Sequence, residues 1–324
     1  MELVDRMLEG NSLSLARLIS MVENRSPAVP EIMRRINQNL GHAYRIGITG
    51  PPGAGKSTLT DRLTTVLRQR GQSVGIVAID PTSPFSGGAL LGDRIRMQQH
   101  YLDPGVFIRS MGTRGSLGGL ARATKDVVRL LDASGKDWVI VETVGVGQTE
   151  LDVVEAADTT IVVLVPESGD AIQTMKAGLM EIADIFVVNK ADRGGADRLV
   201  AEIQSMVRLA QKGNGWEIPV ISAQAEHSRG ITEITLAIEE HRAMLKHSGE
   251  FDRRREQFRR HELIEIIKEG FKTSLLERSR DDSVLGRCVE KVMAGELDCY
   301  SAACQILHDT DLLHSILASN GSER

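Results

Sequence analysis

The sequence lacks the features that would mark a membrane or nucleic-acid-binding protein. No apolar run approaches the roughly 20 residues that a membrane-spanning helix requires. Residues 1–9 carry acids where a secretion signal or transit peptide would carry bases. The chain has no excess of positive charge, since its net charge is -5 and its isoelectric point is about 6.0. We therefore expect a cytoplasmic protein with neither a membrane nor a nucleic acid as partner.

Cysteine is also scarce. Cys288, Cys299 and Cys304 are an odd number, and their spacings suit neither a disulfide framework nor a metal site. We expect them to be buried small side chains in a helical tail. With 41% hydrophobic residues in a chain of 324, the sequence can bury a sizeable core.

One stretch fits a phosphate-binding loop without a mismatch. Residues 50–57 read GPPGAGKS, which matches the pattern G-x-x-x-x-G-K-[ST]. A short apolar run precedes them, and a helical pattern over residues 56–70 follows, which is the context that the motif requires. Lys56 would reach the β and γ phosphates and assist catalysis. The predicted nucleotide contacts here are Gly50, Gly53, Ala54, Gly55, Lys56, Ser57 and Thr58.

Short apolar runs alternate with helical stretches from residue 44 to about residue 243. The runs are continuously apolar rather than alternating, which predicts strands buried on both faces of a mainly parallel sheet. The fold class is therefore α/β, with ligands beyond the carboxyl ends of the strands. The predicted strands are residues 44–49, 74–79, 106–109, 138–142, 160–165, 185–188 and 218–221.

Helical segments flank this predicted domain. Residues 1–43 form either a helical hairpin packed on the main domain or a mobile arm. Its first helix would have an apolar face of Leu13, Leu15, Leu18, Ile19 and Val22. We predict three parts, namely a helical extension over 1–43, a nucleotide-binding domain over 44–248 and a helical arm over 249–324.

The C-terminal arm begins with an arginine-rich run over residues 251–260. The run lacks interleaved aromatic residues, so a solvated helix face is expected rather than a nucleic-acid-binding stripe. Leu263, Ile266, Ile267 and Phe271 then form an apolar stripe. Such a stripe needs a partner surface, either the main domain or a second subunit.

Carboxylates follow two of the predicted strands on the ligand side. Asp80 ends the second strand, Asp93 lies in the loop after it, and Glu142 ends the strand over 138–142. Mg²⁺ prefers oxygen ligands, so Ser57, Asp80, Asp93 and Glu142 are the predicted metal ligands. Helix or turn capping is the alternative for the two aspartates.

The segment after the strand over 138–142 would face the γ-phosphate. Nucleotide switches usually have Asp where this chain has Glu142, and the longer side chain could bind Mg²⁺ through water or orient the attacking water. Gly145 would donate its backbone N–H to a γ-phosphate oxygen. A catalytic role for Gln148 stays open.

The run NKAD over residues 189–192 indicates base specificity, because it directly follows the strand over 185–188. Asp192 can accept from guanine N1–H and N2–H₂, groups that adenine does not offer in that arrangement. The Lys190 stem can lie over the ring, and Asn189 can tie neighbouring loops together. A backbone N–H from the run Ser222, Ala223 and Gln224 could reach guanine O6. We therefore predict GTP and GDP as ligands.

With these motifs in this order, the chain resembles the MeaB/ArgK family, GTPase chaperones of adenosylcobalamin-dependent acyl-CoA mutases, chiefly methylmalonyl-CoA mutase. The likeness covers nearly the whole chain. It implies a SIMIBI-class P-loop GTPase core with helical extensions, a homodimer formed by the C-terminal arm, and Mg²⁺ contacts by the four ligands named above. It also implies that the loop containing Gln173 and Lys176 is a switch that communicates with the mutase.

The activity expected from this resemblance is hydrolysis of GTP to GDP and phosphate, gating cofactor loading and protection of the mutase. Loss of the γ-phosphate would release the loops over 80–93 and 143–149. Three alternatives are an ATP-dependent kinase of a transport protein, a metal-delivery GTPase and a nucleotide-binding scaffold without turnover. The base motif disfavours the first, and the position of all three cysteines beyond residue 287 disfavours the second.

Overall fold

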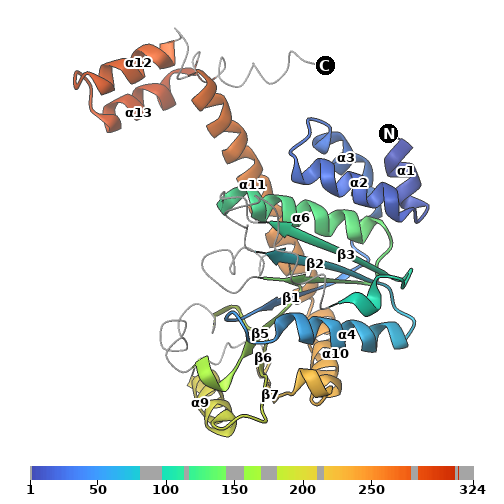
Figure 1. Ribbon diagram of the computed structural model, residues 1–324. Helices are drawn as coiled ribbons and strands as arrows, with labels where there is room; N and C mark the ends of the chain where they lie inside the picture. Colours follow the sequence, from blue (N-terminus) through green and yellow to red (C-terminus); the bar gives the residue numbers. More distant parts are fainter. Residues whose placement is uncertain are drawn as a thin grey trace. The chain divides into compact units, whose positions relative to one another are not determined.

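The computed structural model describes residues 2–80, 97–112, 117–143, 157–168, 181–209, 215–278, 284–310 and 313. The chain separates into two compact units, Met1–Asp252 and Arg253–Arg324, and each is described by itself. The first unit is built around a sheet (Figure 1). Its strands are β1 (Tyr44–Thr49), β2 (Val74–Asp80), β3 (Val106–Gly112), β4 (Trp138–Glu142), β5 (Thr159–Leu164), β6 (Ile185–Val188) and β7 (Val220–Ser222).

The sheet has seven strands in the order β3-β2-β4-β1-β5-β6-β7, and every paired strand is parallel to its neighbour. All residues of β4, β5 and β6 are buried, because helices cover both faces of the sheet. This confirms the α/β fold with a parallel sheet. Strand β1 lies in the middle, so the loop that follows it opens between the ends of β4 and β5.

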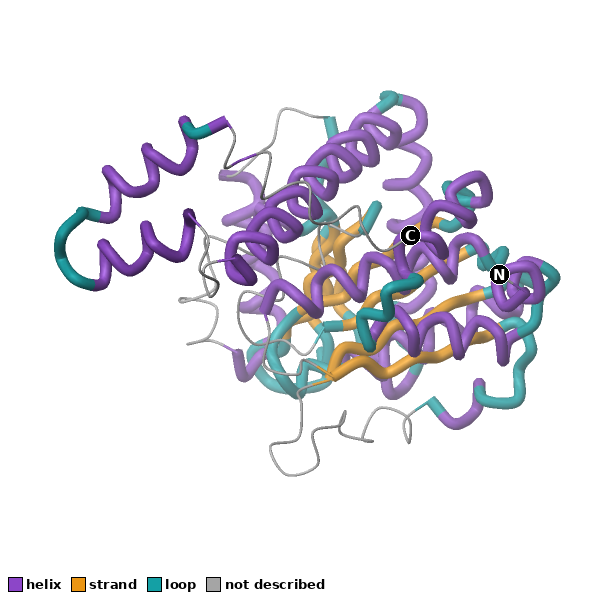
Figure 2. The backbone as a smooth tube through the Cα atoms, turned by 90° about the horizontal axis from the view of Figure 1, so that it is seen from above, coloured by secondary structure: helices purple, strands orange, loops and turns teal. Residues whose placement is uncertain are grey.

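Helices surround the sheet, as the tube in Figure 2 shows from above. Those of the first unit are α1 (Glu2–Leu8), α2 (Ser12–Glu23), α3 (Val29–Ile36), α4 (Lys56–Gln69), α6 (Leu117–Ala133), α9 (Ala196–Leu209) and α10 (Ile231–His247). Short 3-10 turns are η1 (Asn37–Asn39), η2 (Gln98–His100), η3 (Pro166–Ser168) and η4 (Ala225–His227). Helix α11 (Glu250–Arg278) begins in the first unit and continues in the second, which also contains α12 (Val284–Met293) and α13 (Cys299–His308).

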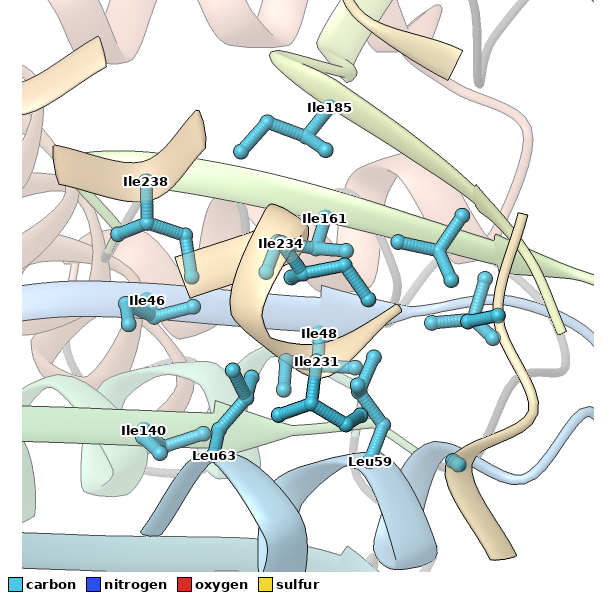
Figure 3. Close-up of a cluster of buried hydrophobic side chains, with 14 of the residues drawn as sticks. Ile46, Ile48, Leu59, Leu63, Ile140, Ile161, Ile185, Ile231, Ile234 and Ile238 are labelled. Atoms are coloured by element: carbon cyan, nitrogen blue, oxygen red, sulfur yellow. The ribbon is translucent and has the colours of Figure 1, made fainter. Parts of the chain in front are cut away.

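Separate apolar clusters cover the two faces of the sheet. On one face, α4 and α10 pack against β1, β4 and β5 (Figure 3). Ile46 and Ile48 of β1 meet Leu59 and Leu63 of α4 in this cluster, and Ile234 enters it from α10. The opposite face is covered by α6 and the N-terminal helices, and α9 packs against β5 and β6. The helix that follows the phosphate loop is therefore fixed to the sheet by its own apolar face.

The N-terminal helices are packed on the main domain, one of the two alternatives considered for them. Leu15, Leu18 and Ile19 of α2 are buried in the cluster that includes Val127 and Leu131 of α6. The side chain of Leu13 is 61% exposed, so its predicted place on the buried face was wrong. The reason is helical phase, because the face toward α6 runs through the spacing i, i+3, i+4 from Leu15.

Several strand limits differ from the prediction. Strand β3 continues to Gly112 because it pairs with β2 along its whole length. Strand β5 starts at Thr159 and ends at Leu164, one residue earlier than predicted at each end. Strand β7 starts at Val220, two residues late, after Pro219, which has no N–H to donate to a neighbouring strand. These shifts leave the ligand side of the sheet where the sequence placed it.

The second unit has a small apolar cluster in which Leu285 is buried against Phe271, Leu275 and Ile306. Cys299 and Cys304 are exposed and Cys288 is partly buried, so the prediction of buried cysteines was wrong. All three are free thiols. The short helices α12 and α13 cannot bury every face of so small a unit.

Most of the arginine-rich run is exposed, as predicted for a solvated helix face, although Arg255 is buried. Among the described residues, no helix is both long and apolar enough to cross a bilayer. The division into three parts with limits at residues 43 and 248 stays a prediction.

Candidate nucleotide-binding site

The phosphate loop connects the end of β1 at Thr49 to the start of α4 at Lys56. Gly50 has φ of 139°, and a Cβ atom there would lie 1.9 Å from the carbonyl oxygen of Val163 in β5. Gly55 has φ of 89°, and its Cβ would lie 2.3 Å from Nδ2 of Asn189. Only glycine fits both positions, because the backbone conformation and the space each exclude a side chain.

The ammonium group of Lys56 is enclosed by this loop. Its Nζ donates to the carbonyl oxygens of Gly50 at 2.8 Å and Pro51 at 3.1 Å, and the residue is only 6% exposed. A buried cation needs acceptors, and phosphate oxygens are stronger acceptors than carbonyls. The arrangement holds a positive charge at the N-terminus of α4, where the helix dipole adds to it.

A carboxylate and two hydroxyl groups meet at the start of α4. Glu142 pairs in register with Ile48, so β4 delivers its side chain beside the phosphate loop. Ser57 Oγ donates to Glu142 Oε1 at 2.5 Å, and Thr60 Oγ1 lies 3.0 Å from Glu142 Oε2. All three side chains are buried. The structure therefore brings together two of the four predicted metal ligands, Ser57 and Glu142.

This donor set fits Mg²⁺. It consists of oxygen atoms from a hydroxyl and a carboxylate, which a hard divalent cation prefers. The described residues contain no group of three or more His, Cys, Asp and Glu side chains that would hold a softer ion such as zinc. The backbone of Asp80 ends β2, next to β4.

The structure does not describe the side chains at the other predicted metal, catalytic and switch positions. The side chain of Asp80 is not described, and Asp93, Gly145, Gln148, Gln173 and Lys176 lie outside the described residues.

Asn189 joins three segments of the site. Its Nδ2 donates to the carbonyl oxygen of Ala54 at 2.8 Å, and its Oδ1 accepts from the N–H of Ala225 at 3.0 Å. Its own N–H donates to the carbonyl oxygen of Leu164. The side chain is buried, with 3% of its surface exposed. The amide thus fixes the phosphate loop relative to the loop after β7.

Lys190 and Asp192 follow Asn189 in the same loop. Lys190 has a left-handed backbone with φ of 56°, and its Nζ donates to the carbonyl oxygen of Gly53 at 2.8 Å. Asp192 is exposed at the turn that follows. Arg193 makes an ion pair with Glu167 of η3, which lowers the pKa of Glu167. The carboxylate of Asp192 can therefore contact solvent or a nucleotide base. Contacts of Lys190 and Arg193 fix the turn on either side of it.

The structure qualifies the role predicted for the loop after β7. The N–H of Ala223 donates to the carbonyl oxygen of Val188 at 2.8 Å, and that of Gln224 donates to Arg229 at 3.0 Å. Both groups already have backbone acceptors, so contact with guanine O6 would require sharing or exchange. Ser222 ends β7 with its side chain exposed.

Sequence reasoning missed two further hydroxyl contacts. Thr60 was assigned no role, although it lies one helical turn after Lys56, a spacing that brings both to one side of α4. Thr143 Oγ1 donates to Thr49 Oγ1 at 3.0 Å and links the ends of β4 and β1. Helical spacing could have identified Thr60, whereas the second contact depends on strand order, which no local pattern gives.

Comparisons with known proteins agree with this geometry. The sequence profile of the family described as "Methylmalonyl Co-A mutase-associated GTPase MeaB" matches residues 15–280. A protein of Pyrococcus abyssi, whose name assigns it provisionally as a GTPase, is 51% identical over 95% of this chain and 96% of its own. GTPase ArgK of Escherichia coli is 37% identical over 79% of this chain and 80% of its own.

Two further similarities concern a mammalian relative and a solved structure. The mitochondrial methylmalonic aciduria type A homolog of Mus musculus is 33% identical over 82% of this chain and 70% of its own. The crystal structure titled "LAO/AO transport system kinase" superposes with a TM-score of 0.72 at 27% identity and covers 94% of this chain and 95% of its own. The profile match spans well over half of the chain, and the relatives match along most of their lengths. This chain is a GTP hydrolase and belongs to the MeaB family of methylmalonyl-CoA mutase-associated GTPases.

Proposed function

We propose that the chain couples GTP hydrolysis to the service of an adenosylcobalamin-dependent acyl-CoA mutase, with methylmalonyl-CoA mutase as the first candidate. The observation that carries the proposal is the match of residues 15–280 to a family described as associated with that mutase. The likeness to the mouse methylmalonic aciduria homolog over most of the chain supports the same assignment. In this proposal GTP hydrolysis gates loading and protection of the mutase cofactor.

The site residues have defined roles in the proposal. Lys56 exchanges the carbonyl oxygens of Gly50 and Pro51 for oxygens of the β and γ phosphates. The backbone of the phosphate loop supplies further N–H donors at the start of α4. Asp192 binds the guanine edge. Asn189 holds the phosphate loop and the loop after β7 in fixed positions relative to each other. Bound Mg²⁺ would neutralise charge that develops on the phosphates.

Ser57 and Glu142 would hold the metal, the hydroxyl directly and the carboxylate directly or through water. Asp80 and Asp93 complete the proposed ligand set, and Gly145 the γ-phosphate contact. Glu142 also accepts a hydrogen bond from the Ser57 hydroxyl group, which leaves a lone pair of Ser57 Oγ for the cation. The segment containing Gln173 and Lys176 is assigned to communication with the mutase, by family resemblance alone.

The test is GTP hydrolysis by the purified protein, alone and with the acyl-CoA mutase from the same source. We expect the GTP turnover rate to rise several-fold with the mutase, because partner contacts organise transition-state groups that an isolated switch GTPase holds poorly. ATP serves as the control nucleotide and should not be hydrolysed in either condition. Lys56→Ala is the control for contaminating hydrolases, since it removes the enclosed ammonium group.

Each contrary result has its own meaning. An unchanged GTP rate with a mutase verified to be active would reject the coupling to that enzyme and leave the GTPase intact. ATP hydrolysis at the GTP rate would instead favour a transport-system kinase, the name carried by the similar crystal structure. Stoichiometric binding of Ni²⁺ to the nucleotide site would favour metal delivery.

A further inference from the structure

The hydroxyl of Thr60 occupies a position that none of the roles above uses. We propose that Thr60 is a positioning residue that holds the second carboxylate oxygen of Glu142, so that this carboxylate keeps one orientation toward Mg²⁺. The inference rests on the proposed metal site and adds a residue to it. Thr60 itself need not contact metal or nucleotide.

Geometry supports a specific contact. Thr60 Oγ1 lies 3.0 Å from Glu142 Oε2, while Ser57 Oγ lies 2.5 Å from Glu142 Oε1. The two hydroxyl groups thus donate hydrogen bonds to different oxygens of one carboxylate. Thr60 is 0% exposed and Glu142 is 3% exposed, so water competes poorly for either group.

The single proton of Thr60 decides the direction of the bond. Thr60 Oγ1 also lies 3.0 Å from the carbonyl oxygen of Lys56, and one hydroxyl hydrogen cannot serve both acceptors fully. When Glu142 is ionised, its oxygen is the stronger acceptor. The proton therefore points to Glu142, and the Lys56 carbonyl retains the helical hydrogen bond that its position in α4 provides.

The position of Thr60 is itself held. Leu59 and Leu63 are buried in the core and anchor the same turn of α4 to the sheet. A donor on so rigid an element restricts rotation of the Glu142 carboxylate about its last bond. Without that donor, the carboxylate would lose part of its compensation for burial and could turn away, which weakens a cation site.

The experiment measures Mg²⁺ dependence rather than turnover. The fluorescent nucleotide N-methylanthraniloyl-GDP is bound to the full-length protein, and its dissociation rate is followed as the Mg²⁺ concentration is varied. Thr60→Val replaces the hydroxyl by a methyl group of similar size, and Thr60→Ser restores it. Thr64→Val is the matched control, because Thr64 is equally buried on the same helix and its hydroxyl group donates to the Thr60 carbonyl oxygen.

We expect Thr60→Val to raise the Mg²⁺ concentration for half-maximal nucleotide retention about 10-fold, the scale of one hydrogen bond to a charged group. Thr60→Ser and Thr64→Val should stay within about twofold of the wild type, since both keep the donor to Glu142. Thermal unfolding is recorded in parallel, and Thr60→Ala replaces the valine variant if that variant does not fold. A purely structural role would change the unfolding temperature and leave the Mg²⁺ midpoint in place.

Two results overturn the inference in distinguishable ways. If the wild type depends on Mg²⁺ and the folded Thr60→Val protein has the same midpoint, the role of Thr60 is wrong and the metal site stands. If wild-type retention of the nucleotide does not depend on Mg²⁺, the proposed metal site is wrong and the role of Thr60 fails with it.

Discussion

Asp192 is an exposed carboxylate on a turn that its neighbours hold in place. The N–H of Ala191 donates to Ala223 at 3.0 Å, and Lys190 Nζ reaches the carbonyl oxygen of Gly53. Removing the charge should therefore change base recognition without moving the loop. We predict that Asp192→Asn weakens GTP binding by about 2 kcal/mol, the scale of charge-assisted hydrogen bonds, and favours xanthosine triphosphate. Xanthine presents an oxygen where guanine has its amino group, so the new amide can donate to it.

Competition binding with the two nucleotides is the measurement for Asp192. Asp197→Asn is the matched control, because Asp197 is an exposed aspartate in the first turn of α9. It should keep the wild-type preference. An Asp192→Asn protein that still prefers GTP would remove Asp192 from base recognition.

At the scale of elements, α4 is tied to η2 by polar contacts to the buried carboxylate of Asp61. His100 Nε2 lies 3.3 Å from Asp61 Oδ1, and Gln99 Nε2 donates to Asp61 Oδ2 at 2.7 Å. The pKa of His100 is raised above its ordinary value of 6.5, chiefly by this pairing with Asp61, with Asp103 adding to the effect. Burial opposes the shift but does not cancel it.

The raised pKa of His100 has a pH consequence of definite sign. The folded protein binds the imidazole proton more tightly than the unfolded chain does, so the stability from this pair is complete below pH 6.5. It disappears as the pH rises through the folded pKa. We predict that the stability advantage of the wild type over His100→Gln falls by about 1 kcal/mol between pH 6 and pH 9.

Urea unfolding of both proteins at several pH values checks this prediction. Subtracting the free energy of unfolding of the variant from that of the wild type at each pH cancels the contributions of the other titrating groups. His227→Gln controls for the substitution itself, since His227 is an exposed histidine on η4. An advantage that is constant or grows toward pH 9 would contradict the predicted proton linkage.

The elements that the sequence predicted well are those with a strong local signal. Continuous apolarity located β4 and β6 to the residue, because strands buried on both faces are apolar at consecutive positions, in β4 as far as Glu142 at its end. The phase of α2 was misjudged at Leu13, since apolar periodicity does not say which turn meets the neighbouring helix. The base-binding role proposed for residues 189–192 rests on their four-residue motif, whereas the backbone bonds that occupy Ala223 and Gln224 depend on strand pairing.

Over the whole molecule, the contacts that fix distant segments could not be predicted from local patterns. Asp132 at the end of α6 is fully buried and accepts from the N–H groups of Gly41 and Ala43 and from Arg45. These hydrogen bonds join α6 to the segment between the N-terminal helices and β1, and the bonded residues are about ninety positions apart in the sequence. No periodicity or short motif encodes such a pairing. The same holds for Thr60 and Glu142, which meet only after β4 has paired with β1.

The second unit supports a prediction about assembly. Leu263 and Ile267 of α11 are 58% and 60% exposed, and their spacing of four residues puts both on one side of the helix. Among the described residues of this unit, the core around Leu285 is small, so burial of this stripe against a second copy would stabilise the unit. We therefore predict a homodimer that the C-terminal arm forms, as family resemblance also implies. Light scattering after size-exclusion chromatography should give twice the chain mass of 35.4 kDa.

Charge placed on this stripe should dissociate the dimer. The double variant Leu263→Glu with Ile267→Glu should give the mass of one chain at micromolar concentration, because two carboxylates cannot be buried unpaired across an apolar contact. Leu209→Glu is the control, since Leu209 is 89% exposed at the end of α9 in the first unit. That variant should remain dimeric, and all of these proteins should still hydrolyse GTP if the core folds independently of assembly. A wild-type protein of single-chain mass, or a double variant that stays dimeric, would show that this stripe is not the subunit contact.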